Sequence, residues 1–266
     1  MSCRLLAVLV GALALCAPDV AAAAPPQAGP PHATTQAKPS TKATRKPKGK
    51  RKRNRKGTRK RKGKRASRAA RPSARPANMP SGWAWPPTPA MRKQGVACTT
   101  QLDQLGVSWK PAPKQRKIAT PITVAAMEFG GLKVIPTFRR PPFIMDCELA
   151  VALTLHGREL YARGVRELYF SRIYGYTQVR TGGTTKRALS RHALGLAIDI
   201  RAIVDDTGHK AVVQDDYLKD DPLLLRVEDY LNDSGGFRTV LTPRNDPKSH
   251  YDHFHVEAKV DYLGGP

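Results

Sequence analysis

A long run of positive charge limits where this chain can fold. Residues 38–75 carry 20 Lys and Arg, and no acidic residue occurs between Asp19 and Asp103. Like charges repel, and residues 24–90 are poor in large apolar side chains, so this segment cannot bury enough surface to offset its chain entropy. Residues 94–266 carry 23 basic and 20 acidic residues, a net charge of only about +3. We therefore expect a disordered basic tail at 24–90 and a folded domain at 91–266.

The first 23 residues have the pattern of an export signal. Arg4 supplies a positive start, residues 5–17 are apolar, and residues 21–23 are three alanines that suit cleavage. The apolar run is too short to cross a bilayer stably. We expect a signal peptide at 1–23 and no transmembrane segment in the mature chain, which would be periplasmic, wall-associated or secreted. The alternative is an uncleaved N-terminal anchor.

Two cysteines remain once the signal and its own Cys3 and Cys16 are removed. In an oxidising compartment, Cys98 and Cys147 most simply form a disulfide. Such a bond would stabilise the domain by about 3–4 kcal/mol on the chain-entropy model. Two free buried thiols are the alternative. Neither residue belongs to a Cys-x-x-Cys pair, so we do not expect these cysteines to bind zinc.

The region beyond residue 90 mixes helix and strand patterns. Helices are predicted at 146–163, where Asp146 is the N-cap and Gly164 ends the helix, and at about 221–232, where Pro222 lies in the first turn. Strands are predicted at 132–135, within 166–180, and at 196–200, 211–213, 238–241 and 254–256. The fold class is α+β, with a small antiparallel sheet flanked by helices and strands clustered in the second half.

Two short stretches contain four of the seven histidines. Residues 190–199 read SRHALGLAID and contain His192 and Asp199; residues 249–257 read SHYDHFHVE. Alternation along a strand places His253, His255 and Glu257 on one face. A lone His-x-His is more often a surface feature, but His192, Asp199 and His255 together supply three ligands that zinc prefers and leave a fourth position for water. Such a site lowers the pKa of the water to about 7 and polarises a carbonyl. The two stretches predict a mononuclear catalytic zinc site.

The same stretches carry a resemblance to known families. Ser-x-His-x-x-Gly-x-Ala-x-Asp followed by His-x-His resembles the group of lysostaphin-type peptidases, D-alanyl-D-alanine carboxypeptidases and the hedgehog fold. LSRHALGLAIDI followed by TVLTP and HYDHFHVE is more closely similar to the extensin-like C-terminal domain of exported bacterial proteins. The resemblance covers roughly residues 95–260. It implies a peptidoglycan substrate and cleavage of amide bonds in stem peptides or crosslinks.

The resemblance also implies a role for each motif residue. His192, Asp199 and His255 match the metal ligands, and His253 matches an imidazole that orients water or stabilises the oxyanion. The general base is either Asp252, three residues before the last ligand, or His250, five residues before it; we favour His250 paired with His253. Arg180 and Ser190 are expected to bind substrate, since a guanidinium grips a carboxylate in bidentate fashion.

We therefore expect an exported zinc peptidase of the D,D- or L,D-type that acts on peptidoglycan. One alternative is a non-catalytic envelope-binding module that keeps the metal for stability. The tail is expected to bind anionic envelope polymers in a salt-dependent way, or to act as a solvated spacer. It lacks interleaved aromatic residues for base stacking, so a secreted nucleic-acid binder is the least favoured reading.

Overall fold

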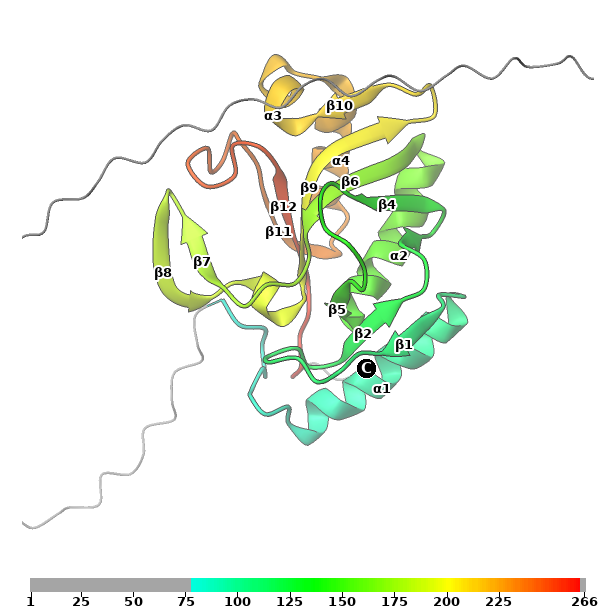
Figure 1. Cartoon of the computed structure of the whole chain (residues 1–266), viewed down its shortest axis with the longest axis vertical. Coiled ribbons are helices and arrows are strands. Elements are labelled where there is room, and N and C mark those ends of the chain that lie inside the picture. Colours follow the sequence, from blue (N-terminus) through cyan, green and yellow to red (C-terminus); the bar gives the residue numbers. More distant parts are fainter. Residues whose placement is uncertain (1–77, 264–266) are drawn as a thin grey trace, which may run out of the picture. The chain divides into compact units, whose positions relative to one another are not determined.

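The computed structural model describes residues 78–263 (Figure 1). The predicted signal peptide and residues 24–77 of the predicted tail lie outside these residues. Residues 78–88 form part of the folded unit, because Met79 is buried in the core and Ser81 forms a β-bridge with Asp261. Folded structure therefore extends further toward the N-terminus than the predicted domain start at residue 91.

A seven-stranded sheet forms the centre of the described part. Its order is β11-β12-β9-β6-β4-β3, with β10 paired to β9. The bounds are β3 Glu128–Phe129, β4 Leu132–Pro136, β6 Val165–Arg172, β9 Ala197–Asp205, β10 Lys210–Val212, β11 Phe237–Leu241 and β12 Phe254–Ala258. The predicted α+β class with antiparallel strands is confirmed, but the sheet is larger than expected, and one of its strand pairs, β4 with β6, runs parallel. A parallel pair needs a crossover, and the chain makes it through α2 (Cys147–Ala162), which lies between them in sequence.

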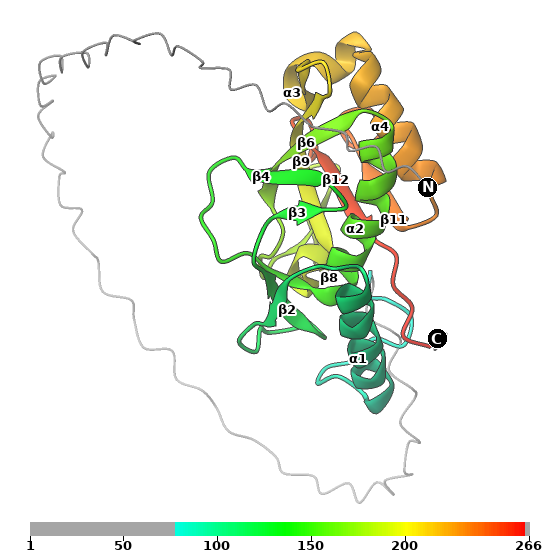
Figure 2. The same cartoon turned by 90° about the vertical axis from the view of Figure 1, so that its right-hand side faces the viewer.

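Two helices with clear end signals cover one face of this sheet. Asp146 caps α2 by accepting the N–H of Glu148 at 3.1 Å. Asp221 caps α4 (Pro222–Asp233), which begins with a proline as predicted. Figure 2 shows both helices on the same side of the sheet. Apolar side chains from the helices and strands meet there, among them Leu153, Leu160, Ile198, Leu231 and Val256.

A second layer of structure precedes α2 and was not predicted. It contains α1 (Pro89–Gln104) and a three-stranded sheet of β1 (Trp109–Pro111), β2 (Pro121–Val124) and β5 (Ile144–Asp146). The predicted disulfide is present and joins Cys98 in α1 to Cys147, the first residue of α2, with their Cα atoms 6.1 Å apart. Both cysteines are buried. The bond therefore fastens α1 onto the start of α2.

A two-stranded hairpin projects from the other side of the central sheet. It consists of β7 (Gln178–Thr181) and β8 (Thr184–Leu189), and neither strand pairs with any other strand between residues 78 and 263. Figure 1 shows it on the opposite side of the sheet from α2. We call residues 178–189 the flap. The remaining short elements are η1 (Arg191–Leu194), α3 (Val213–Asp216) and η2 (Tyr217–Lys219). Within the described range, the helices are too short or too polar to cross a bilayer.

Candidate metal centre

The candidate site forms where β9 and β12 run side by side. The two strands are antiparallel and place Asp199 directly opposite His255. Because side chains alternate along a strand, Ile198 and Val256 enter the core under the helices while Asp199 and His255 lie on the opposite face. The pairing of two neighbouring strands thus brings together residues 56 positions apart in sequence.

His192 reaches the same place from the turn η1, which leads into β9. Ser190 caps this turn by accepting the N–H of His192 at 3.3 Å. Gly195 ends it with φ +68°, and a Cβ at this position would lie 2.7 Å from the backbone nitrogen of Asp146. A glycine is needed here for both its left-handed conformation and its lack of a side chain. The motif therefore folds back tightly enough to aim His192 at Asp199.

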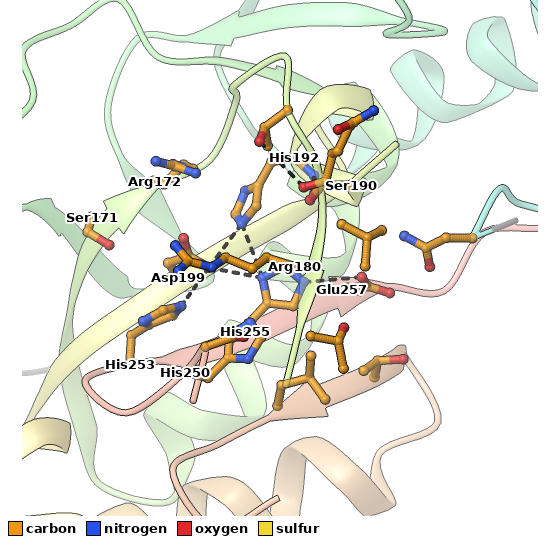
Figure 3. A pocket seen from close by; sticks show the side chains of 18 of the residues that line it. Ser171, Arg172, Arg180, Ser190, His192, Asp199, His250, His253, His255 and Glu257 are labelled. Atoms are coloured by element: carbon orange, nitrogen blue, oxygen red, sulfur yellow. Dashed lines mark hydrogen bonds and ion pairs between the residues drawn. The ribbon is translucent and has the colours of Figure 1, made fainter. Parts of the chain in front are cut away.

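Three donor atoms from these residues form a compact triangle. His192 Nε2 is 3.0 Å from Asp199 Oδ1 and 3.1 Å from His255 Nδ1, and the third side, from His255 Nδ1 to Asp199 Oδ1, is 2.9 Å. All three side chains are buried. Figure 3 shows them pointing toward one another. They form the only metal-competent group of histidine, cysteine and acidic side chains found between residues 78 and 263.

The far nitrogen of each imidazole is already engaged. His192 Nδ1 lies 2.7 Å from the carbonyl oxygen of Ile173, and His255 Nε2 lies 3.1 Å from Glu257 Oε1. Glu257 is buried and also forms an ion pair with Arg238. A histidine that binds a metal commonly donates its other ring N–H to a carbonyl or carboxylate in this way. The surroundings therefore orient both rings with a metal-binding nitrogen toward the triangle.

The triangle fits a small tetrahedral ion. Zinc–nitrogen bonds of about 2.0–2.1 Å separate neighbouring donors of a tetrahedron by about 3.3–3.4 Å. The donor separations of 2.9–3.1 Å lie within a few tenths of an ångström of that value. Two imidazoles and one carboxylate also form a ligand set of the kind that zinc accepts. The residues could thus hold a metal ion.

Without a cation, hydrogen bonds connect the two imidazoles to Asp199. Burial alone would raise the pKa of Asp199, but the charge and hydrogen bonds of His192 and His255 outweigh it and lower that pKa well below its usual value. Burial alone would lower the pKa of His255, but hydrogen bonds to Asp199 and Glu257 raise it to about 9. The pocket therefore favours an ionised carboxylate next to a positive charge, which a metal ion can supply in place of the proton.

Two more histidines border the triangle. The ring centroid of His250 lies 5.3 Å from that of His255 and 5.1 Å from that of His253. Burial, together with the charges of His255 and His253, lowers the pKa of His250 to about 4, so the ring is neutral at pH 7. His253 Nε2 is 3.4 Å from Asp199 Oδ1, and its Nδ1 is 2.6 Å from Asp252 Oδ1. Both histidines are close enough to act on a molecule bound at the triangle.

The other predicted site residues line the same cavity, which has a volume of about 750 Å³. Arg180 extends from the flap toward the triangle (Figure 3), and its guanidinium forms no hydrogen bond or ion pair with another described residue. Ser190 is buried at the edge of the cavity, where it also caps η1. Asp252 is paired with Arg201 as well as with His253. Every predicted site residue apart from the disulfide cysteines therefore lies around one cavity.

Several residues at the site were not singled out from the sequence. The placement of Glu257 on the face of His255 was predicted, but its bond to that ring was not. Arg201 and Arg238 line the cavity and pair with acidic neighbours. Asp246 lies 3.1 Å from His250 Nδ1. The i, i+2 spacing of His255 and Glu257 on a strand was a usable signal; Arg201, Arg238 and Asp246 carried none, because their partners come from other elements or from a turn.

Comparison with known proteins places the chain in a family. The model of the family described as extensin-like protein C-terminus matches residues 96–264. Neither the curated proteins nor the solved structures contain a match to this chain. The matched region includes all three residues of the triangle and both cysteines, and it covers more than half of the sequence.

Proposed function

The chain belongs to the extensin-like protein C-terminus family, and from this premise we propose that it is an exported zinc-dependent peptidase. Its substrate would be peptidoglycan, in which it would hydrolyse amide bonds of stem peptides or crosslinks. The observation that carries the proposal is the triangle of His192, Asp199 and His255 at the wall of an open cavity, with the second nitrogen of each imidazole held by a carbonyl or carboxylate. The proposal includes the relationship to zinc peptidases that the two histidine motifs predict.

His192, Asp199 and His255 would hold the ion. When bound, zinc lowers the pKa of a coordinated water to about 7 and polarises a substrate carbonyl. The strand pairing and the cap at Ser190 fix the three donors in advance, so little rearrangement is needed for binding. Bonds from Ile173 and Glu257 keep the metal-binding nitrogens directed inward.

The neighbouring side chains favour His250 over Asp252 as the general base. Both oxygens of Asp252 are occupied, one by His253 Nδ1 and the other by Arg201, and the pair of neighbours outweighs burial and lowers the pKa of this carboxyl. His250 is neutral at pH 7 and has one ring nitrogen available to accept a proton. Asp252 would then hold His253, whose Nε2 would donate to the developing oxyanion.

Arg180 and Ser190 supply polar groups for the substrate at the edge of the cavity. An unpaired guanidinium suits a carboxylate, which stem peptides carry at their C-terminus and on their acidic side chains. The basic tail would keep the enzyme close to anionic envelope polymers through salt-dependent contacts. The proposed export rests on the predicted signal peptide, and a disulfide in the domain supports it.

Metal content and peptidoglycan digestion together test this proposal. We expect the purified full chain to contain about one zinc per molecule, as a mononuclear site requires, and to release peptide fragments from purified peptidoglycan. A His192→Ala/His255→Ala variant should lose both properties, because it keeps one of the three donors. His209→Ala is the matched control, since His209 is exposed and outside the cavity.

The outcomes separate the candidate functions. Zinc without fragments would favour a non-catalytic envelope-binding module whose metal stabilises the fold. A parent protein without stoichiometric metal would contradict the assignment of the site itself. Zinc can be measured by plasma mass spectrometry, and fragments by liquid chromatography with mass spectrometry.

A further inference from the structure

Asp246 connects two parts of the cavity wall that are distant in sequence. It lies in the loop between β11 and β12 and is buried. Its Oδ2 is 3.1 Å from His250 Nδ1, while its Oδ1 accepts the backbone N–H of Gly182 at 3.0 Å. Gly182 is at the tip of the flap, 64 residues earlier in the chain. One carboxylate thus contacts both the proposed base and the flap.

The first of these contacts determines where His250 carries its proton. A carboxylate accepts hydrogen bonds and does not donate them, so the ring nitrogen that faces Asp246 must be protonated. The neutral ring then has its lone pair on Nε2, which has no hydrogen-bond partner within residues 78–263. His250 lines the cavity. A general base needs this free lone pair, and the opposite tautomer would lack it at Nε2.

The second contact holds the flap. The flap pairs with no other strand of the described chain, and most of its residues are exposed. Two hydrogen bonds fix its tip, one from Gly182 to Asp246 and one from Gly183 N–H to Ser249 Oγ at 2.9 Å. Arg180 lies two residues before Gly182 on the flap. The latch at the tip therefore also determines where Arg180 lies.

We propose that Asp246 is a positioning residue, which keeps the Nδ1 proton on His250 and latches the flap over the cavity. One carboxylate then fixes both the proposed base, His250, and the flap that carries Arg180. The effect on turnover rests on the proposed peptidase function, but the effects on the His250 tautomer and on the flap do not. The backbone of Asp246 also makes turn hydrogen bonds to Thr242 and His250; these do not involve the side chain and would persist in a variant.

Three variants separate the two roles. In Asp246→Asn, the amide oxygen can still accept from Gly182, but the amide nitrogen donates toward His250 and favours the tautomer with its proton on Nε2. Ser249→Ala removes the neighbouring latch and leaves the bond between Asp246 and His250 in place. Asp246→Ala removes both contacts. The asparagine variant has nearly the same shape as the parent, so it remains informative if the alanine variant does not fold.

The tautomer is read from the ring nitrogen-15 shifts of His250 in the full chain with zinc added. The flap is read from hydrogen exchange of residues 178–189. We expect Asp246→Asn to move the proton to Nε2 without faster flap exchange, and Ser249→Ala to do the reverse. Asp246→Ala should speed up flap exchange. Where the parent cleaves peptidoglycan, Asp246→Asn should reduce turnover by about 100-fold or more with zinc content unchanged.

An unchanged His250 tautomer in Asp246→Asn would overturn the proposal that Asp246 keeps the proton on Nδ1 of His250. Unchanged flap exchange in Asp246→Ala would overturn the latch. These two readouts need no turnover, so they judge the inference even if the parent protein proves inactive. An inactive parent with the expected tautomer and flap changes would contradict the proposed function alone.

Discussion

Asp199 and Asp146 are both buried aspartates, yet their surroundings shift the pKa values of their carboxyl groups in opposite directions. Two imidazoles approach Asp199, and their charge and hydrogen bonds outweigh burial and lower its pKa well below the usual value. Burial dominates at Asp146, where hydrogen bonds from three backbone N–H groups only partly offset it, and the pKa rises to about 7. Burial alone therefore does not mark a chemical site. What distinguishes Asp199 is the convergence of two imidazoles, whose charge and hydrogen bonds stabilise the ionised carboxylate.

The two regions also touch. The backbone N–H of Asp146 donates to the carbonyl of Gly195 at 3.0 Å, and Gly195 ends the turn that carries His192. Cys147, next in the chain after Asp146, forms the disulfide to α1. We propose that the first region holds a metal ion, whereas the second, through its disulfide, fastens α1 to the start of α2. Three changes test how far they are independent.

Removal of the disulfide should have the largest effect on stability. The bond closes a loop with a sequence separation of 49, so Cys98→Ser/Cys147→Ser should lower the free energy of unfolding by about 3–4 kcal/mol on the chain-entropy model. We expect zinc content to be unchanged where the variant is still folded, because the cysteines lie outside the triangle. Denaturant unfolding and metal analysis measure the two quantities. Loss of zinc from the folded variant would show that the two regions are not independent.

A side chain added at Gly195, where the two regions touch, should reduce both stability and zinc binding. Gly195→Ala adds a Cβ 2.7 Å from Asp146 N at a residue with φ +68°. It should lower the free energy of unfolding by about 2–3 kcal/mol, from left-handed strain and displaced backbone together, and should weaken zinc binding by moving His192. Gly208→Ala is the matched control, with φ +84° and open space around its Cβ. It should show only the strain, about 1–2 kcal/mol, and equal effects in both variants would contradict a role for the contact.

Counted per pH unit, the smallest expected effect is a pH dependence at Asp146. Its pKa is higher in the folded protein, about 7, than the ordinary 3.8 of the unfolded chain. Between these values the folded protein keeps a proton that the unfolded chain releases, so stability falls as pH rises from about 4 to 7 and levels off above. The slope is at most about 1.4 kcal/mol per pH unit.

Asp146→Asn should remove that slope. The difference in unfolding free energy between parent and variant, measured from pH 4 to pH 8, cancels titrations that both proteins share. A difference that does not change with pH would mean that Asp146 stays ionised in the folded protein.

Local patterns in the sequence were enough to predict several helices and strands, and to identify the three residues of the triangle. Helix α2 was predicted with Asp146 as its N-cap and α4 from Pro222 in its first turn, and both features are present. The closeness of His192, Asp199 and His255 was predicted because the second and third lie on strands and the first precedes a glycine turn. Alternation along β12 also placed Glu257 on the side of His255.

Other parts depend on contacts that no local pattern encodes. Helix α1 contains Gly95, Val96 and two threonines, which are weak helix formers, and no helix was predicted there. Strands β1, β2 and β5 have only three or four residues each, too few for a periodic pattern. Asp246 contacts the flap 64 residues away. Such parts take shape through packing against the rest of the domain, so they become visible only in the fold.

Under the proposed function, the position of His255 along the chain sets when a metal can be bound. Two donors lie close together at positions 192 and 199, but the third is on β12, which follows every other strand of the described chain. During synthesis, the first two residues emerge well before β12 can pair with β9. A chain that has not yet emerged beyond residue 255 offers only two of the three donors, and tight metal capture must wait for this last pairing. Metal uptake would therefore report that the domain has been completed and folded.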